Sequence, residues 1–317
     1  MIKKILFLCM TLMILLMPKG PVEAAGITAY EKFISPAYWT KHNADGDKVV
    51  LNAAGVEAFN KKIIAASPTV YDMAAYPKTL SGKTVTAYVN THTDLSDELY
   101  REGKLVSDNY KNILRSQTNA AAIPAEVTVR YGVTVRRANL RNLPTGEGLF
   151  FYASDRNFDA LQETALDPGE AVAILHTSTN GYFYYVQAYN YRGWLSKFDV
   201  AETDRSTWLR YAEPKNFLTV VAKDYTLKAD GAQVLFQQGA RLQLADKKAS
   251  AYTVKVPVRT KEGKLQEEKV VLAANASLHE GYLPYTTNNI IRSAFKFYDS
   301  VYGWGGLQQS VDCSSFI

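Results

Sequence analysis

Short runs of alternating apolar and polar residues fill the middle of the chain, from about residue 126 to about residue 280. The first group, over 126–200, includes EVTVRYGVTVRRANLR, EAVAILHTS and YFYYVQAY, and turn signals such as DPGE and TNGY separate the runs. The second group, over 208–280, includes AYTVKVPVRT and EEKVVLAA, which are joined by the turn KEGK. Alternation of this kind between turn signals is typical of strands with one buried face. The pattern predicts two separate small antiparallel β-barrels, and no close sequence repeat relates them.

The segments on either side of the barrels have helical patterns. Asn52 suits the N-cap of NAAGVEAFNKKIIAA, in which Val56, Phe59, Ile63 and Ile64 recur at helical spacing, and Ser67-Pro68 ends the pattern. We expect residues 27–122 to be largely helical and to pack on the barrels. A second apolar stripe predicts a helix over 288–299, and its members are Ile290, Ile291, Ala294, Phe295 and Tyr298.

The first residues have the layout of a secretory signal peptide. Lys3 and Lys4 precede an apolar run, and small residues then place a cleavage site near Ala24 or Ala25. The apolar run is short for a membrane span. We therefore expect an exported protein, in the periplasm, the cell envelope or the extracellular space, with no stable membrane insertion after cleavage.

The chain has 2 cysteines, and one of them, Cys9, lies in the predicted signal peptide. The mature protein would keep only Cys313, so that no internal disulfide is possible. A leftover thiol in an exported protein is an intermolecular partner, an idle buried residue or a nucleophile.

The charge of the chain is mildly positive. The net charge of +5 falls by two when the predicted signal peptide, with three lysines and one glutamate, is removed. No basic cluster indicates nucleic-acid binding, although the charge suits an anionic cell wall. We expect neither a cofactor nor a metal, and the oligomeric state stays open.

The end of the chain resembles a known family. In the NlpC/p60 cysteine peptidases, which cut bacterial peptidoglycan stem peptides, a helix leads into a Tyr-x-Trp-Gly-Gly turn, and the nucleophile follows in Asp-Cys-Ser-Gly at the start of the next helix. Here YGWGG matches the turn with Tyr302, Trp304, Gly305 and Gly306. Asp312, Cys313 and Ser314 match the nucleophile motif, and Ser315 replaces its glycine.

The resemblance extends upstream. VRYGVTVRRANLRNLPT, LQETALDPGEAVAILHTS and YRGWL are similar to the bacterial SH3-like domain that precedes the peptidase in multidomain members. The implied fold class is multidomain α+β, with a helical N-terminal stabilising segment, two SH3-like β-barrels and the first helices of a papain-like α+β peptidase domain. The expected parts are a signal peptide at 1–25, the helical domain at 26–125, the barrels at 126–205 and 206–283, and the start of the peptidase domain at 284–317.

The resemblance also implies roles for individual residues. Cys313 is the expected nucleophile, and a helix N-terminus beginning there would stabilise its thiolate, whereas an ionised Asp312 would oppose it. In such members the first barrel blocks one side of the site, so that the substrate begins with a free L-Ala and is cut after γ-D-Glu. Asp312, Glu163 and Tyr191 are the candidates for holding the amine, Tyr302 would lie beside the reacting carbonyl or that amine, and Ser314 would line the pocket.

A cysteine peptidase also needs a base, usually a histidine. The family's histidine follows the cysteine, whereas all 4 histidines of this chain, His42, His92, His176 and His279, precede it. His42 and His92 are interpreted as surface residues, His176 as a barrel strand end and His279 as a linker residue. We therefore expect a fragment that ends inside its catalytic domain and is inactive alone. The alternative is a non-catalytic SH3-like module that binds the cell wall. Trp194 is interpreted as a core residue.

Overall fold

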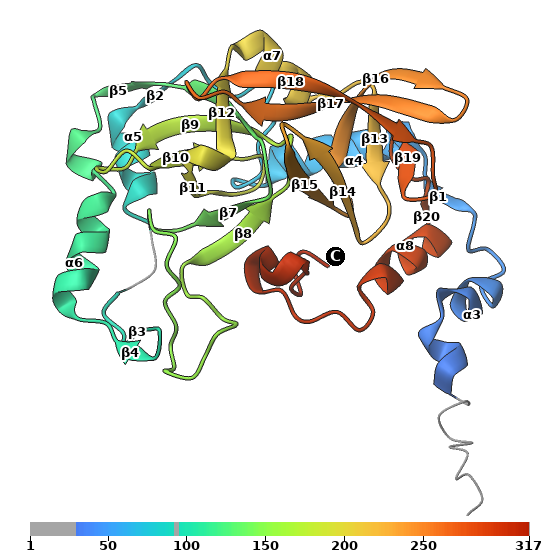
Figure 1. The fold of residues 1–317 in the computed structure, drawn as a ribbon, viewed down its shortest axis with the longest axis horizontal. Helices are drawn as coiled ribbons and strands as arrows, with labels where there is room; N and C mark the ends of the chain where they lie inside the picture. The colour runs from blue at the N-terminus through green and yellow to red at the C-terminus, as the bar shows by residue number, and fades with distance from the viewer. Residues whose placement is uncertain (1–29, 92–94, 317) are drawn as a thin grey trace, which may run out of the picture.

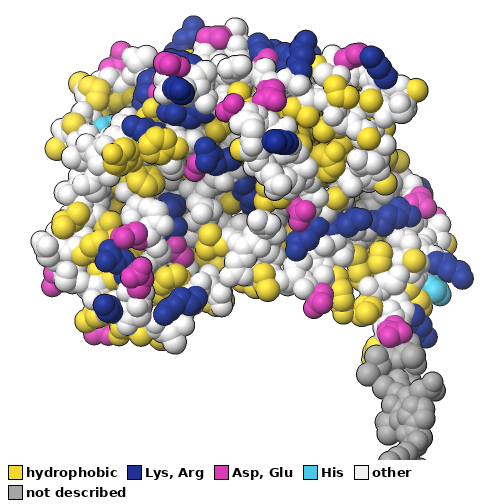
Figure 2. All heavy atoms as spheres, in the orientation of Figure 1, with side chains coloured by type: hydrophobic (Ala, Val, Ile, Leu, Met, Phe, Trp, Pro, Cys, Tyr) yellow, Lys and Arg dark blue, Asp and Glu magenta, His cyan; other side chains and the backbone are white. Residues whose placement is uncertain are grey.

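The computed structural model describes residues 30–91 and 95–316 (Figure 1). The predicted signal peptide, His92 and Ile317 lie outside these residues. Helices and sheets are mixed along the chain, which agrees with the predicted α+β class; the predicted domain limits stay predictions. In the described part of the chain no helix is both long and apolar enough to span a membrane. Acidic and basic side chains are interspersed over the face shown in Figure 2.

Residues 130–203 form a seven-stranded antiparallel sheet, here called the first barrel. Its spatial order is β12-β6-β9-β10-β11-β7-β8. The strands are β6 (Arg130–Thr134), β7 (Ala138–Arg141), β8 (Gln162–Leu166), β9 (Ala171–Thr177), β10 (Phe183–Gln187), β11 (Arg192–Ser196) and β12 (Val200–Thr203). The long loop 142–161 joins β7 to β8, which are neighbours in the sheet.

Both faces of strand β9, in the first barrel, are buried. Along β9, Val172 and Ile174 pack in the interior cluster with Leu140, whereas Ala173 and Leu175 belong to a second cluster on the other face. That second cluster includes residues of the N-terminal segment as well as Trp208 and Trp194, and Trp194 is fully buried as predicted. The run Ala171–Leu175 is therefore buried at every position, as in a strand with both faces covered.

Residues 217–280 form the second barrel, which shares no strand with the first. A five-stranded sheet has the order β18-β17-β16-β13-β19, and β14 and β15 form a separate hairpin. The strands are β13 (Phe217–Val220), β14 (Asp224–Ala229), β15 (Ala232–Gln237), β16 (Arg241–Lys248), β17 (Ala251–Arg259), β18 (Leu265–Ala273) and β19 (Leu278–Glu280). Val254 and Val256 on β17 are fully buried and Val258 packs against the same core, as their alternation predicts. The helix α7 (Arg205–Ala212) connects the two barrels.

The N-terminal segment is helical only in part. Its helices are α3 (Pro36–Lys41), α4 (Ala53–Ala66), α5 (Gly82–Val89) and α6 (Asp108–Gln117), with short 3-10 turns η1 (Lys32–Ile34) and η2 (Ala120–Ala122). Short strands join this segment to the rest of the molecule: β1 (Val49–Leu51) pairs with β20 (Tyr285–Thr286), and β2 (Thr79–Ser81) pairs with β5 (Glu126–Thr128). The strands β3 (Tyr100–Arg101) and β4 (Lys104–Leu105) form a hairpin.

The predicted helix after Asn52 forms, and it is more exposed to solvent than a helix in a protein core. The Asn52 side chain accepts a hydrogen bond from the Gly55 amide at 2.8 Å, and the helix ends at Ala66, before Ser67. Its apolar stripe is partly open to solvent, because Phe59 is 55% exposed and Ile63 is 38% exposed.

The predicted helix over 288–299 is shorter than expected. Helix α8 (Thr287–Ala294) is capped by Thr286, whose hydroxyl accepts from the Asn289 amide at 3.1 Å. It continues as the 3-10 turn η4 (Phe295–Phe297), and Asp299 then adopts a left-handed backbone conformation with φ of 62°. The backbone already leaves the helical conformation at Tyr298, with φ of −56° and ψ of 135°, so that the last member of the stripe lies outside the helix.

A buried ion pair fixes the loop 142–161. Arg141 Nη1 lies 2.7 Å from Asp159 Oδ2, and the two side chains are 5% and 7% exposed. Asp159 Oδ1 accepts from the amides of Leu149 and Leu161, so that the carboxylate connects both ends of the loop. Both charges are thus taken out of water and paired, with only Arg141 Nε left without a hydrogen-bond partner among the described residues, and the loss of either charge is costly.

We predict that Asp159→Ala lowers the free energy of unfolding by about 3–5 kcal/mol, because it leaves Arg141 buried without its counter-charge. Chemical denaturation followed by tryptophan fluorescence measures this change. Glu57→Ala is the matched control, since Glu57 forms an exposed pair with Lys61 on the surface of α4 and its loss should leave the denaturation midpoint unchanged. Equal effects of the two substitutions would contradict the central role of the buried pair.

Candidate active site

Cys313 lies on the surface, in a turn near the end of the described chain. Its thiol is exposed, and the Tyr302 hydroxyl donates a long hydrogen bond to Cys313 Sγ at 3.7 Å. This contact raises the pKa of Tyr302. A hollow of about 260 Å³ opens beside the thiol, lined in part by Phe297, Val301 and Phe316. The turn motif and the nucleophile motif are thus brought together, and the Tyr302 hydroxyl lies close enough to contact a ligand group bound at the thiol.

Asp312 holds the turn that carries Cys313. Its Oδ1 accepts from the amides of Ser314 and Ser315 at 3.0 and 2.8 Å, and the Phe316 amide donates to the Asp312 carbonyl at 3.0 Å. In return, the Ser315 hydroxyl accepts from the Asp312 amide at 2.9 Å. These reciprocal bonds are those of a capping box at the first turn of a helix. Ser315, where the family has glycine, therefore supplies half of the cap.

The charge of Asp312 is stabilised by this network. Partial burial raises the pKa of Asp312, but hydrogen bonds from Ser315, Ser314 and the Gly305 amide outweigh it and hold the pKa below its ordinary value. The Gly305 amide donates to Asp312 Oδ2 at 3.0 Å, and this bond joins the glycine turn to the cysteine turn. Ser314 donates its hydroxyl to Asp312 Oδ1 at 2.8 Å and is not among the residues that line the hollow, so its predicted lining role stays a prediction.

The Trp-Gly-Gly turn packs on strand β8 of the first barrel (Figure 1). It forms η5 (Trp304–Gln309), in which Gly305 and Gly306 have φ of 54° and 76°. A Cβ atom on Gly305 would lie 2.6 Å from Gln162 Cγ, and one on Gly306 would lie 2.8 Å from Ala165 Cβ. Both the backbone conformation and the close approach therefore require glycine.

Two side chains and one backbone carbonyl of the first barrel hold the same turn by its polar groups. Gln162 Nε2 donates to the Gly305 carbonyl at 2.9 Å, and Arg137 Nη2 donates to the Gly306 carbonyl at 3.2 Å. In the other direction, Trp304 Nε1 donates to the Asp159 carbonyl at 3.0 Å. The position of the cysteine segment, defined here as residues 302–316, is thus set largely by the first barrel.

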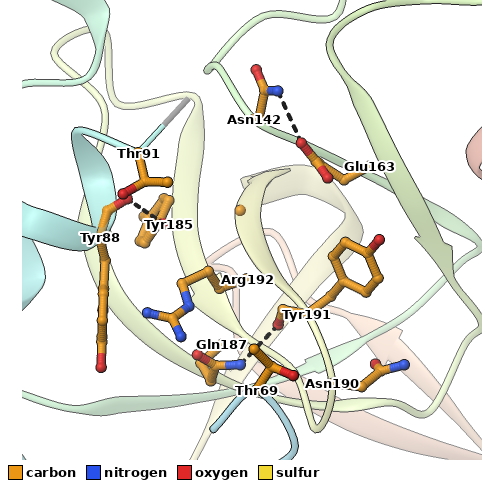
Figure 3. A pocket seen from close by; sticks show the side chains of 11 residues that line it. Thr69, Tyr88, Thr91, Asn142, Glu163, Tyr185, Gln187, Asn190, Tyr191 and Arg192 are labelled. Atoms are coloured by element: carbon orange, nitrogen blue, oxygen red, sulfur yellow. Dashed lines mark hydrogen bonds between the residues drawn. The ribbon is translucent and has the colours of Figure 1, made fainter. Parts of the chain in front are cut away.

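Glu163 and Tyr191 line a cavity of about 670 Å³ between the first barrel and the N-terminal segment (Figure 3). Glu163 follows Gln162 on β8 and accepts from Asn142 Nδ2 at 2.9 Å. Tyr191 precedes β11, and burial raises its pKa, to which the carboxylates of Glu163 and Asp312 also contribute. Glu163 and Asp312, which were predicted with Tyr191 to hold an amine, therefore both lie within electrostatic reach of Tyr191, although the three are far apart in the sequence.

Other residues of this cavity were not foreseen from the sequence. Thr69, Tyr88 and Thr91 reach it from the N-terminal segment. Figure 3 shows Tyr88 beside Arg192 on the side away from Glu163, and the Arg192 guanidinium lies 3.6 Å from the centre of the Tyr88 ring. Gln187, which is 1% exposed, donates to the Tyr191 carbonyl at 3.0 Å. Asn142, Gln187 and Arg192 stood in stretches that the sequence had marked, whereas Thr69, Tyr88 and Thr91 are brought to the cavity by packing over long sequence separations.

None of the three described histidines lines the hollow beside Cys313. His42 caps α3 on the surface, as expected for a surface residue. His176 lies near the end of β9 and its Nε2 is 3.0 Å from the Asn119 carbonyl; burial lowers its pKa. His279 was predicted in a linker, but it belongs to β19 and pairs with Thr219, because residues 278–280 complete the edge of the second sheet. Within residues 30–91 and 95–316, no group of acidic, histidine or cysteine side chains is arranged to hold a metal ion.

Comparison with known proteins supports the resemblance read from the sequence. Residues 149–196 match the SH3 domain family of the SH3b1 type. The chain is also similar in structure to a protein described as a novel NlpC/P60 endopeptidase from Photobacterium damselae subsp. piscicida, with a TM-score of 0.65 and 19% sequence identity. The match covers 88% of this chain and 64% of that protein, so the chain spans less than two thirds of its length. No curated protein sequence matches the chain significantly. These findings confirm the resemblance to NlpC/P60 proteins with SH3 domains, and the structural likeness shows a shared fold.

We predict that Gly305→Ala loosens the cysteine segment. The substitution combines an unfavourable left-handed conformation with a clash against Gln162, which is itself held by Arg141, and should cost about 2 kcal/mol or more. Hydrogen exchange should show faster exchange of the amides at 302–316. Gly146→Ala is the control, because a Cβ there would meet nothing within 4 Å. Unchanged protection of 302–316 in Gly305→Ala would show that packing on β8 does not hold the segment.

Proposed function

We propose that this chain is the part of a peptidoglycan stem-peptide hydrolase that carries the nucleophile and the accessory domains. The specific activity proposed is that of a γ-D-glutamyl-L-diamino acid endopeptidase acting on peptides with a free N-terminal L-Ala. One observation carries the proposal: an exposed cysteine in a capped turn is docked beside a cavity that holds Glu163 and Tyr191. The matched SH3 domain and the likeness to an NlpC/P60 endopeptidase support peptidoglycan as the target and, with it, export from the cytoplasm.

In the proposed reaction the Cys313 sulfur attacks the γ-carbonyl carbon of D-Glu. The C–N bond to the diamino acid then breaks, the amine leaves with a proton, and water hydrolyses the resulting thioester to free the γ-carboxylate and restore the thiol. A base must accept the thiol proton and return it to the leaving amine. Because the described histidines lie elsewhere, we assign this base to the portion of such a protein that this chain does not match.

Tyr302 is proposed to act at the reacting centre. Its hydroxyl already donates towards Cys313 Sγ, and the same group could donate to the substrate carbonyl oxygen once the sulfur bonds to carbon.

The free amine of L-Ala is proposed to bind chiefly to Glu163. A charged ammonium needs acceptors that still have free lone pairs, and Glu163 accepts one side-chain hydrogen bond, from Asn142. Asp312, in contrast, already accepts from two amides and two hydroxyls at Oδ1 and from the Gly305 amide at Oδ2. We therefore assign Asp312 mainly to positioning Cys313, with its negative charge adding attraction, and Tyr191 to the wall of the amine site.

A second candidate function is a non-catalytic module that binds the cell wall. The matched SH3 domain at 149–196 favours it, because the first barrel is complete without the cysteine segment. The two candidates differ in what Cys313 does: Cys313→Ala would leave a binding module unchanged and would abolish a hydrolase.

We predict that the dipeptide L-Ala-γ-D-Glu binds to the chain and that acetylation of its amine weakens binding by about tenfold to a hundredfold, since a charge-assisted hydrogen bond contributes about 1.5–3 kcal/mol. Glu163→Gln should cause a similar loss for the free dipeptide and little further loss for the acetylated one. Isothermal titration calorimetry measures both. Glu262→Gln, in the β17–β18 turn, is the control and should bind as the wild type does. Equal affinity for the free and the acetylated dipeptide would rule out the amine site.

We also predict that residues 26–317 alone do not cleave L-Ala-γ-D-Glu-diamino acid peptides, because no described base contacts Cys313. A longer protein that includes a portion supplying this base should cleave them and should lose nearly all activity on Cys313→Ser, since a hydroxyl is much harder to deprotonate than a thiol. Chromatography of the released diamino acid measures both reactions. Cleavage by the short chain that Cys313→Ala abolishes would show that the base lies within it.

A further inference from the structure

A second cavity, of about 460 Å³, lies apart from Cys313 where three parts of the molecule meet. The N-terminal segment contributes Tyr71, the first barrel contributes Glu170 and Tyr189, the second barrel contributes Arg241, and Tyr282 follows the last strand of the second barrel. It shares no lining residue with the Glu163 cavity or with the hollow beside Cys313. Its size is within the range of small-molecule sites. We call it the tyrosine cleft.

An acidic and a basic side chain, Glu170 and Arg241, form a loose ion pair in the tyrosine cleft. Glu170 Oε2 and Arg241 Nη2 are 3.8 Å apart, and their side chains are 21% and 23% exposed. Among the described residues Arg241 is the only ionic partner of Glu170, and no donor is within hydrogen-bond distance of the Glu170 carboxylate. Two charged groups held at this separation can each bond to one bridging ligand group, the carboxylate to a donor and the guanidinium to an acceptor.

Tyrosine rings flank this pair and remain open to solvent. Tyr189 is 51% exposed and lies within electrostatic reach of Glu170 and Arg241, and Tyr282 is 64% exposed and lies within reach of Arg241. Two contacts hold Tyr282 in place: Phe217 packs edge-on against its ring at 4.8 Å, and Arg241 Nη1 donates to its hydroxyl at 3.4 Å. The buried Tyr211 forms part of the wall. Such rings offer an apolar face with a polar rim.

We propose that the tyrosine cleft binds a neutral oligosaccharide of acetamido sugars. Sugar rings have apolar C–H faces that stack on tyrosine, and an acetamido group carries one N–H donor for Glu170 and one C=O acceptor for Arg241. The charges disfavour other occupants. Glu170, Asp72 and Glu213 outnumber Arg241 and repel a polyanion, whereas Arg241 beside Glu170 opposes an ammonium group. The site would hold a sugar chain independently of the chemistry at Cys313.

Titration of the chain with tetra-N-acetylchitotetraose, followed by tyrosine and tryptophan fluorescence, tests this inference. We expect saturable binding that Tyr282→Ala weakens by about tenfold, in line with the loss of one stacked ring. Tyr189→Ala should weaken it similarly and serves as the second variant if Tyr282→Ala disturbs the loop. Glu170→Gln should weaken it by a smaller factor. Tyr152→Ala removes an equally exposed ring, 72% exposed, from the loop 142–161 and should bind as the wild type does.

The outcomes separate this proposal from the proposed function. Cys313→Ala should bind the sugar unchanged, so that a failure of the peptidase assignment leaves this binding intact. No saturation by the wild type at millimolar sugar would overturn the inference, as would equal affinity of Tyr282→Ala, Tyr189→Ala and the wild type. Tighter binding of polyphosphate or of a tetralysine peptide than of the sugar would overturn the assigned ligand class.

Discussion

The buried ion pair between Arg141 and Asp159 is the interaction on which the candidate active site depends. Removing two charges almost fully from water is costly unless further hydrogen bonds add to their mutual attraction. Arg141 therefore also donates to Gln162 Oε1 and to the Glu147 carbonyl, and Asp159 closes the loop with two amides. The same residues then face outwards to the cysteine segment, since Gln162 donates to Gly305 and the Asp159 carbonyl accepts from Trp304. The orientation of Cys313 thus begins with a charge pair inside the first barrel.

A second junction, at Asp167, fixes the cysteine segment relative to both barrels. Asp167 Oδ2 pairs with Arg137, whose guanidinium also donates to the Gly306 carbonyl. Asp167 Oδ1 accepts from the Gln237 amide in the second barrel, and the Gln237 side chain donates to the Ser310 carbonyl at 3.3 Å. The Asp167 carboxylate is thus connected to the turn before Cys313 in two ways: through Arg137 to the Gly306 carbonyl, and through Gln237 to the Ser310 carbonyl. The second barrel, which contributes nothing to the hollow beside the thiol, still helps to place it.

Structural features that depend on neighbouring residues were predicted correctly from local sequence patterns. The alternation of Val254, Val256 and Val258, the Asn52 cap and the apolar stripe of α8 depend on neighbouring residues, and the structure contains each of these elements. The early end of α8 and the strand that contains His279 depend on tertiary contacts and a left-handed residue, which periodicity does not report. At the site, the resemblance supplied Cys313, Asp312, Tyr302, Glu163 and Tyr191. It gave no indication of Tyr88 or Thr69, because the N-terminal segment reaches the cavity only through packing. The tyrosine cleft joins residues 71, 189 and 282, which no sequence window contains.

The proposed nucleophile and the proposed amine acceptor lie in different parts of the molecule, and this arrangement affects which peptide would be cleaved. The proposed nucleophile belongs to the cysteine segment, whereas the proposed amine acceptor belongs to β8 of the first barrel, and the two are joined through Gly305, Gly306 and the bonds that surround them. The distance from the amine site to the thiol, which would decide which peptide bond is cut, is therefore a property of the docked pair and not of either part alone. Gln162 and Glu163 are adjacent on β8, so that one residue positions the glycine turn while its neighbour faces the cavity. A change in the loop 142–161 that shifts β8 would move both Glu163 and the cysteine segment. It would thereby change this distance without altering a residue that is proposed to contact the peptide.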